Sequence, residues 1–281
     1  MTDKPDTPSI DRRNFVKLAG ATVAVGATAL YALVEEAAAS AATEAPGRAS
    51  FPTPSYDWTK HRWSFGVDAT RCIGCLSCAA ACKEENGVPG DPYHFRTWVE
   101  RYVYLEGEDE PRIDSQSSPA DIAASNPGAV DPYRFADTHE GKKVEKAFFV
   151  PKLCNHCERP PCVQVCPTGA TYRTKDGAVL IDQNYCIGCR YCVQACPYGV
   201  RTFSEDYGVA DKCTWCYHRI TKGLKPACVE ACPVGARVFG DLDDADSDIN
   251  KFLRDNRVEV LKPAMGTGPT VHYVGIDQNV R

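Results

Sequence analysis

Four cysteines near the middle of the chain follow one another in the pattern C-x2-C-x2-C-x3-C-P, from Cys186 to Pro197. The first three thiolates recur every third residue, so a single loop can wrap them around one corner of an iron–sulfur cluster. The fourth thiolate, which precedes the proline, points away from that corner and binds a second cluster. A segment of this kind therefore requires a partner segment elsewhere in the same chain.

The chain of 281 residues contains sixteen cysteines, and they fall into four groups of four, which we call runs one to four. In chain order the runs are Cys72, Cys75, Cys78 and Cys82; Cys154, Cys157, Cys162 and Cys166; Cys186, Cys189, Cys192 and Cys196; and Cys213, Cys216, Cys228 and Cys232. Three runs end in Cys-Pro, whereas Lys83 takes the place of the proline after run one. Every cysteine belongs to a run, so possible partners for the central run are present.

Three kinds of site compete for an even set of cysteines. Disulfide frameworks are typical of small secreted domains, whereas this chain is long and its cysteines lie only a few residues apart. Structural zinc sites usually pair two separated C-x2-C segments, often with histidine. Runs of four thiolates that end in Cys-Pro favour iron–sulfur ligation over both. The net charge of −5 argues against a nucleic-acid partner.

The N-terminus has the layout of a twin-arginine export signal. Asp11–Lys17 contains two adjacent arginines, Leu18–Val34 is mildly apolar, and small residues follow at Ala37–Ala42. We expect a signal over residues 1–42 and a linker over 43–61. A short membrane anchor and an uncleaved signal stay open as alternatives. A route that exports folded proteins suits a chain that folds around its metal, so we expect a periplasmic location or the outer face of the cytoplasmic membrane.

Patterns between the runs predict short elements. We expect strands at Trp63–Asp68, Arg96–Leu105, Lys146–Val150, Val258–Leu261 and Thr270–Val274, a β-hairpin from Ala170–Arg173 and Ala178–Ile181, a helical turn around Ala79–Ala81 and a short helix at Asp246–Asn256. Residues 106–145 are polar and rich in turn formers, which indicates an insertion that is either a docking surface or a plain surface loop.

The fold class we expect is α+β, with two ferredoxin-like dicluster lobes, short hairpins and short helices. Runs two and three are separated only by the hairpin, so they pair in an inner lobe over residues 146–200. Runs one and four then pair in an outer lobe over 62–105 and 201–240, into which the inner lobe is inserted. Residues 241–281 form a C-terminal cap.

In each pair of runs, the first three cysteines of one run and the fourth cysteine of the other run bind the same cluster. This exchange rule predicts four [4Fe–4S] clusters, each with four thiolate ligands. We name the predicted sites O1 and O2 in the outer lobe and I1 and I2 in the inner lobe. Their ligands are Cys72, Cys75, Cys78 and Cys232 for O1; Cys213, Cys216, Cys228 and Cys82 for O2; Cys154, Cys157, Cys162 and Cys196 for I1; and Cys186, Cys189, Cys192 and Cys166 for I2.

Several side chains beside the ligands are candidates for tuning the clusters. Trp215 lies between two ligands and is expected to shield its cluster from water. His156 and His218 are expected to be neighbours of the ligands rather than ligands, because every site already has four thiolates. Arg159, Arg190 and Lys212 are positively charged and could raise the reduction potential of a nearby cluster. For each of them, however, a solvated position on the surface is the favoured interpretation.

The order of the four runs resembles the iron–sulfur subunits of molybdopterin oxidoreductase complexes, such as the dimethyl sulfoxide, polysulfide, tetrathionate and formate-linked nitrite reductases. The resemblance covers residues 62–281 and includes Pro151–Cys157, Phe95–Glu100 and the Gly-Asp-Leu-Asp-Asp segment that starts at Gly240. It implies a non-catalytic redox subunit, without catalytic residues, that relays single electrons through four [4Fe–4S] clusters.

The same resemblance implies two kinds of partner. One is a polytopic quinone-interacting membrane subunit of the polysulfide-reductase type, at which the chain would be peripheral. The other is a molybdopterin, cytochrome or hydrogenase-type redox subunit. The alternative function is a free-standing exported polyferredoxin that carries electrons between several enzymes, and a structural zinc protein is a more distant one.

Overall fold

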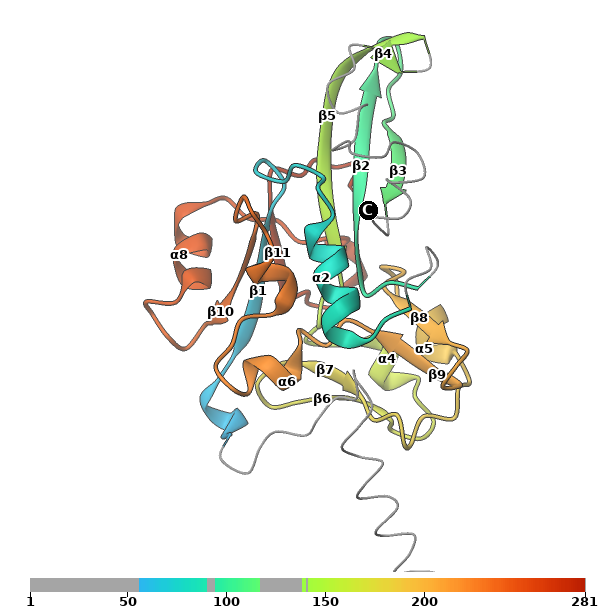
Figure 1. The fold of residues 1–281 in the computed structure, drawn as a ribbon, viewed down its shortest axis with the longest axis vertical. Helices are drawn as coiled ribbons and strands as arrows, with labels where there is room; N and C mark the ends of the chain where they lie inside the picture. The colour runs from blue at the N-terminus through green and yellow to red at the C-terminus, as the bar shows by residue number, and fades with distance from the viewer. Residues whose placement is uncertain (1–55, 90–93, 117–137, 140, 281) are drawn as a thin grey trace, which may run out of the picture. The chain divides into compact units, whose positions relative to one another are not determined.

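The structure is a computed structural model that describes residues 56–89, 94–116, 138–139 and 141–280 (Figure 1). Contacts divide the chain into two units at Pro46, and all described residues belong to the second. The predicted export signal over 1–42 and most of the linker lie outside the described residues. Within the described part, no helix is long and apolar enough to cross a membrane.

One strand of a three-stranded sheet precedes run one, and another strand follows run four. The sheet's central strand β1 (Trp63–Asp68) pairs antiparallel with β10 (Arg237–Asp241) and parallel with β11 (Val271–Val274). Helix α8 (Asp248–Asp255) packs on β10 and β1. The predicted strand at Val258–Leu261 is wrong, because that segment contributes only an isolated bridge. The C-terminal segment thus supplies a strand to the sheet in addition to covering it.

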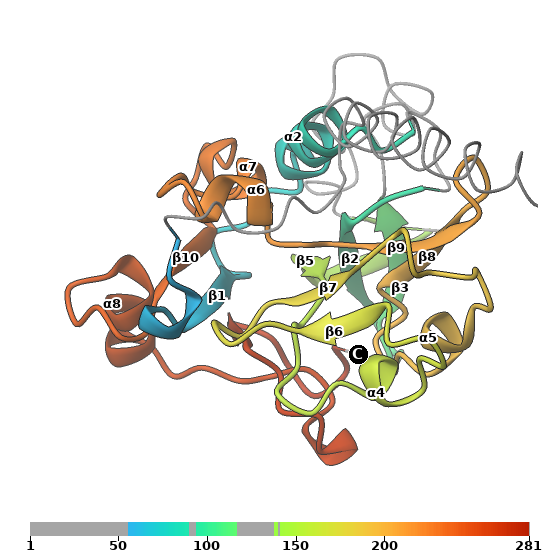
Figure 2. The same cartoon turned by 90° about the horizontal axis from the view of Figure 1, so that it is seen from below.

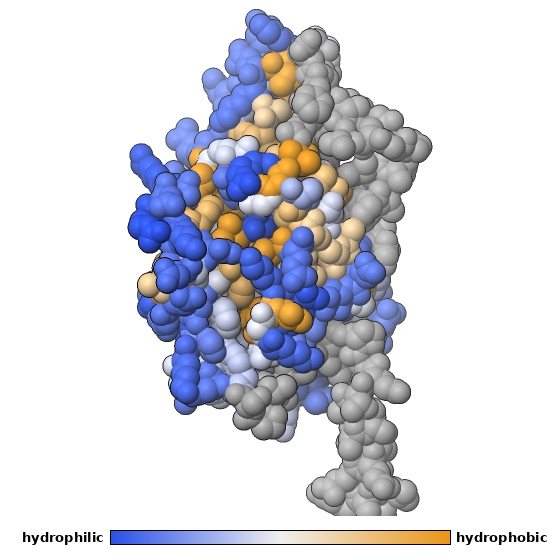
Figure 3. Space-filling model, turned by 60° about the vertical axis from the view of Figure 1, so that its left-hand side comes forward, coloured by the Kyte–Doolittle hydropathy of each residue, from blue (hydrophilic) through white to orange (hydrophobic). Residues whose placement is uncertain are grey.

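Helix α8 begins after Ser247, whose Oγ accepts a hydrogen bond from the backbone N–H of Asn250 at 3.3 Å. Its apolar side buries Ile249 and Phe252. The opposite side carries exposed charged residues such as Lys251. The face of the molecule over this helix is largely hydrophilic, with apolar side chains gathered in patches near the centre (Figure 3).

A four-stranded sheet lies beside α2 (Ser77–Asn86), in the strand order β3-β2-β5-β4 (Figure 1). The strands are β2 (Thr97–Leu105), β3 (Arg112–Gln116), β4 (Thr138–His139) and β5 (Lys142–Leu153), all antiparallel to their neighbours.

This sheet includes part of the polar insertion predicted over residues 106–145, for which the sequence indicated a loop and no strands. Strands β3 and β4 and the first residues of β5 lie in that segment. Its residues are too polar to show a strand pattern, but pairing with β2 and β5 satisfies their backbone groups. Residues 117–137 and 140 lie outside the described part.

The cysteine runs are carried by short elements. Two antiparallel hairpins join them, β6 (Thr171–Arg173) with β7 (Val179–Ile181) and β8 (Arg201–Ser204) with β9 (Val209–Lys212) (Figure 2). The one-turn helices are α4 (Pro161–Gln164), α5 (Tyr191–Gln194), α6 (Tyr217–Ile220) and α7 (Ala227–Glu230), and two 3-10 turns lie at Trp58–Lys60 and Pro263–Met265. Helix α2 packs on α7, and α4 packs on α5. The runs therefore pair as one with four and two with three.

Residues of both lobes belong to one main hydrophobic core. Phe65 of β1, Leu180 of β7 and Trp215 of run four belong to the same cluster of buried residues. The hairpin β8–β9, which we assigned to the outer lobe, contacts α5 of the inner lobe. The C-terminal segment also reaches the inner lobe, where the carbonyl of Gly268 accepts a hydrogen bond from the backbone N–H of Glu158 at 2.7 Å. Together these contacts place residues 201–212 and part of the cap against the inner lobe.

Candidate iron–sulfur sites

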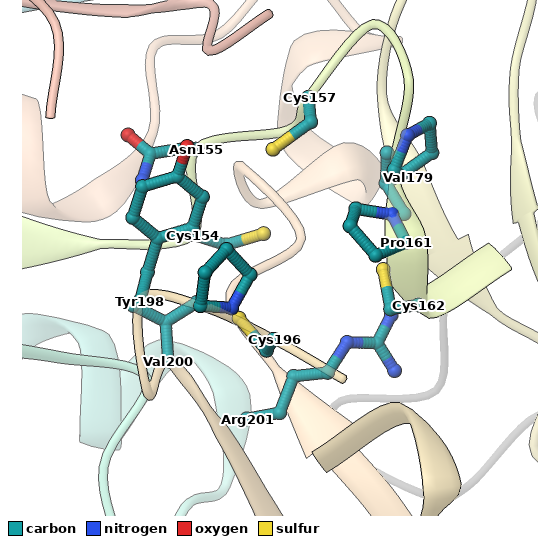
Figure 4. A pocket seen from close by; sticks show the side chains of 12 residues that line it. Cys154, Asn155, Cys157, Pro161, Cys162, Val179, Cys196, Tyr198, Val200 and Arg201 are labelled. Atoms are coloured by element: carbon teal, nitrogen blue, oxygen red, sulfur yellow. The ribbon is translucent and has the colours of Figure 1, made fainter. Parts of the chain in front are cut away.

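One cavity in the inner lobe is lined by the four thiols that the exchange rule assigns to I1, namely Cys154, Cys157, Cys162 and Cys196. Their sulfur atoms face a common space (Figure 4). Three of the thiols come from the loop that follows β5 and from α4, and the fourth comes from the end of run three. Tyr198 and Arg201 also line this cavity. The fold thus brings the fourth cysteine of run three to the first three of run two.

A second cavity holds the thiols predicted for O2, which are Cys82, Cys213, Cys216 and Cys228. All four are buried. The side-chain amide of Asn86 lies 3.6 Å from the sulfur of Cys82 and 3.7 Å from that of Cys216, within reach of a weak hydrogen bond to each. Here α2 delivers the fourth cysteine of run one to the first three of run four.

Three of the thiols predicted for O1 lie close enough to affect one another's ionisation. Burial, together with the neighbouring thiols Cys78 and Cys232, raises the pKa of Cys72 to about 11. Helix α2, which carries Cys78, packs on α7, which carries Cys228. Helix α2 also carries Cys82, so this helix contact belongs to the O2 cavity, whereas the effect of Cys232 on Cys72 brings the end of run four beside run one.

The thiols predicted for I2 are the most exposed. Cys189 is exposed, Cys166 and Cys186 are half-buried, and Cys192 is buried. The contact of α4 with α5 brings run two beside run three, but no cavity in the described part is shown to be lined by all four thiols. Assignment of these four residues to one cluster stays a prediction.

Backbone N–H groups point at several of the sulfur atoms. Sγ of Cys232 accepts from the N–H of Ala236 at 3.2 Å, and Sγ of Cys166 accepts from the N–H of Thr171 at 3.4 Å. Burial acts to raise the pKa of Cys166, but hydrogen bonds from Thr171 and Thr168 outweigh it and lower that pKa. Such bonds favour the thiolate, which is the form that binds iron.

The buried thiols, together with buried hydrogen-bond donors that have no partner, fit an anionic metal cluster. Burial, followed by the neighbouring thiol of Cys154, raises the pKa of Cys213 to about 11, so an uncompensated set of thiolates would be unfavourable. An iron core supplies the positive charge that keeps all four ligands ionised. Around the cavities, buried nitrogens of Arg201, Arg237, His156 and Trp215 have no hydrogen-bond partner among the described residues. Donors without partners are what a buried cluster with its sulfur atoms would satisfy.

Comparisons with known proteins identify the family of this chain. Residues 71–170 and residues 145–242 each match a family model described as a 4Fe-4S dicluster domain. The chain is 38% identical over 220 residues to the B subunit of tetrathionate reductase from Salmonella typhimurium, covering 78% of this chain and 74% of that protein. It is 42% identical over 215 residues to the B subunit of tetrathionate reductase from Archaeoglobus fulgidus, covering 76% and 83%. The chain belongs to the family of reductase iron–sulfur B subunits.

A further relative is the B chain of the anaerobic dimethyl sulfoxide reductase from Escherichia coli, which is 34% identical over 165 residues, covering 59% of this chain and 66% of that protein. The predicted resemblance, the α+β dicluster fold and the presence of [4Fe–4S] clusters are thus confirmed for this iron–sulfur subunit. The twin-arginine signal is not tested by these matches and stays a prediction.

Two aromatic rings next to the ligands of this iron–sulfur subunit are buried, as expected of cluster neighbours. Trp215 is 1% exposed and stacks on His156, with ring centroids 3.9 Å apart. Nδ1 of His156 accepts from the backbone N–H of Val179 at 2.9 Å. Burial lowers the pKa of His156 well below its usual value. His218, by contrast, lies 2.6 Å from a carboxylate oxygen of Glu85.

The three charged residues considered as tuning candidates differ in their exposure to solvent. Arg159 and Arg190 are exposed, as the favoured interpretation has it, and Arg190 lies 3.8 Å from the centroid of the Phe203 ring. A surface position for Lys212 is wrong, because this side chain is fully buried. Its ammonium donates to the carbonyl oxygens of Val179 and, at 2.7 Å, Cys213. Two backbone acceptors at the junction of the lobes hold the charge in the interior.

Sequence reasoning missed three buried arginines beside the cysteines, Arg96, Arg201 and Arg237, which are 5%, 4% and 3% exposed. Each lies beside cysteines of more than one run. A signal was available for two of them, because C-P-x-G-x-R occurs after run three and again after run four. A charge repeated at the same distance from a ligand is a reason to expect a role at the cluster.

Proposed function

We propose that this chain relays single electrons through four [4Fe–4S] clusters inside a respiratory oxidoreductase complex of the molybdopterin type. The clusters supply the one-electron chemistry when bound, and the chain holds the thiolates, excludes water and sets the spacing. The observation that carries the proposal is the lining of the I1 and O2 cavities, each formed by three thiols of one run and the fourth of another. Substrate conversion belongs to a partner subunit.

The contacts support one order of clusters, I2–I1–O2–O1. Sites I1 and I2 share runs two and three, and sites O1 and O2 share runs one and four. Between the lobes, the thiol of Cys154 in I1 acts on that of Cys213 in O2. The stacked rings of His156 and Trp215 come from the same two loops. A chain of neighbours in this order gives electrons a continuous path from one lobe to the other.

The two ends of this order are the more exposed sites. At I2 the exposed thiol of Cys189 lies among large exposed side chains, since Tyr185 and Ile187 are each 66% exposed and Tyr191 is 59% exposed. At O1, Cys72, Cys75 and Cys232 are half-buried, whereas all four thiols of O2 are buried. Electrons therefore enter and leave at I2 and O1.

We assign the two ends to two partners. One is a polytopic quinone-interacting membrane subunit of the polysulfide-reductase type, and the other is a catalytic redox subunit. The names of the relatives, as subunits of tetrathionate and dimethyl sulfoxide reductases, support membership of a multi-subunit complex. The arginine pair in Asp11–Lys17 supports folded export and a position at the outer face of the cytoplasmic membrane.

Anaerobic purification of a tagged full-length chain from solubilised membranes tests the proposal. We expect a membrane subunit and a catalytic redox subunit to co-purify. Tyr207 is 62% exposed in the β8–β9 turn. The next residue in that turn, Gly208, lies against Gly188 of run three, so close that a Cβ on Gly188 would be 2.4 Å from the carbonyl oxygen of Gly208. Tyr207 is therefore near run three. Tyr207→Glu should reduce the yield of one partner at least tenfold without loss of iron.

Leu224→Glu is the matched control, because Leu224 is 49% exposed in the outer lobe, and it should leave both partners bound. Purification of the wild-type chain as a soluble, iron-loaded monomer without partners would support a free-standing polyferredoxin instead. A partner yield that Tyr207→Glu and Leu224→Glu reduce equally would contradict docking at I2.

A further inference from the structure

Two buried arginines occupy equivalent places in the two lobes. Each is the last residue of a Cys-Pro-x-Gly-x-Arg segment, Arg201 after Cys196 and Arg237 after Cys232. Each begins a strand, β8 or β10, and each donates to a threonine hydroxyl. These bonds are 3.3 Å from Nη1 of Arg201 to Thr171 and 2.8 Å from Nη2 of Arg237 to a threonine at the start of β2. The fold therefore repeats this cation, and not only the cysteines.

Each arginine faces thiols of two different cluster sites. Arg201 lines the I1 cavity (Figure 4), and its charge acts on Cys162 of I1 and on Cys192 of I2. Arg237 acts on Cys78 of O1 and on Cys228 of O2. Each guanidinium group is thus close to thiols of both cluster sites of its lobe.

Lys212 lies beside ligands of one site in each lobe. Its ammonium is held by the carbonyl oxygen of Cys213, a ligand of O2. Its charge also acts on the thiol of Cys162, a ligand of I1. In the order I2–I1–O2–O1, the buried cations therefore alternate with the clusters.

Within the described part of the chain, no carboxylate pairs with these three cations. Among the described residues, Arg201, Lys212 and Arg237 form no ion pair with an aspartate or glutamate, whereas the buried Arg96 pairs with Asp211 at 2.8 Å. Nη2 of Arg201 and both Nε and Nη1 of Arg237 lack any partner in the described part. A buried charge without a counter-charge is strongly unfavourable. The available counter-charges are the cysteine-ligated clusters, whose net charge is negative.

We propose that Arg201, Lys212 and Arg237 are fixed positive charges, each placed between two successive clusters, that raise the potentials of both neighbours. Reduction adds negative charge to a cluster, so a nearby cation stabilises the reduced state, and the buried surroundings screen this attraction little. The same cation offsets the repulsion between adjacent reduced clusters. This inference rests on the proposed four-cluster relay, and the three residues are positioning residues because they act through the clusters.

Potentiometric titration of the full-length, iron-loaded protein, followed by low-temperature EPR, tests the role of the charge. We expect Arg201→Gln to lower the reduced-to-oxidised ratio of I1 and I2 at a fixed potential at least tenfold. For a one-electron couple that is a shift of about 59 mV to more negative potential. Clusters O1 and O2 should keep their potentials, and Arg237→Gln should give the mirror result.

Two further variants separate charge from packing. Arg201→Lys keeps the charge with fewer donors and should stay within threefold of the wild-type ratio. Arg159→Gln removes an exposed arginine near Cys157 and should also leave the ratio within threefold. If Arg201→Gln loses iron, the same comparison is made at Arg237, where the shift is expected in O1 and O2.

Three results would overturn the inference. They are unchanged potentials in a fully loaded Gln variant, equal shifts in all four clusters, and a shift in Arg201→Lys as large as in Arg201→Gln. Absence of [4Fe–4S] signals from the wild-type protein would instead contradict the relay itself, so the two failures are distinct.

Discussion

Removal of iron by a chelator, under anaerobic and reducing conditions, is expected to unfold the described part of the chain rather than to leave an empty fold. Cys154, Cys213 and Cys228 are buried in the main core, so the clusters that they bind hold the core together. Helices such as α4 and α7 have four residues each, too few to form a stable helix alone. Without clusters, Arg201 and Arg237 would be buried charges with no counter-charge.

The expected magnitude is large. A structural metal in a small zinc domain contributes on the order of 10 kcal/mol to folding, and marginal stability of a domain is about 5–15 kcal/mol. Far-UV circular dichroism should therefore lose its cooperative thermal transition after chelation. Reconstitution with ferrous iron and sulfide is the control and should restore it. A chelated protein that keeps its transition at the original Tm would contradict the prediction.

Replacement of Cys166 by serine is expected to remove one cluster and to leave the other three with complete thiolate shells. The exchange rule assigns Cys166 to I2, although it belongs to the run whose first three thiols line the I1 cavity. EPR of the reduced variant should therefore lose the I2 signal and keep the I1 signal. The iron content should fall by about one quarter, the share of one cluster in four.

Cys196→Ser is the matched control, since Cys196 follows the run-three thiols but lines the I1 cavity. It should remove I1 and keep I2. If Cys166→Ser removed the signal that Cys196→Ser is expected to remove, the exchange between runs two and three would be wrong. Loss of both signals from each variant would show that the two clusters depend on each other for assembly.

Local patterns were sufficient for much of the fold. The strand at Trp63–Asp68 has the predicted bounds, and the hairpin between runs two and three and the helix near residue 250 are present. These elements follow from alternation and turn residues, which act over a few positions. The pairing of runs one with four and two with three also agrees with the contacts of α2 with α7 and α4 with α5.

Features that depend on distant partners were not predictable in the same way. Strand β3 forms because β2 offers a free edge, and nothing in its own polar residues indicates that edge. Lys212 was expected to lie on the surface, and the two repeated arginines were given no role. The reason is that buried cations are rare without a counter-charge. Their counter-charge is a cofactor that the sequence implies only through the cysteines.

Iron and acid-labile sulfide, counted per chain in protein purified anaerobically, test the central claim most directly, with Mössbauer spectra to identify the cluster type. Four [4Fe–4S] clusters require about 16 iron atoms and about 16 sulfides per chain, all in cubane sites. About half that number, a three-iron signal in the freshly prepared protein, or zinc in place of iron would contradict a four-cluster relay.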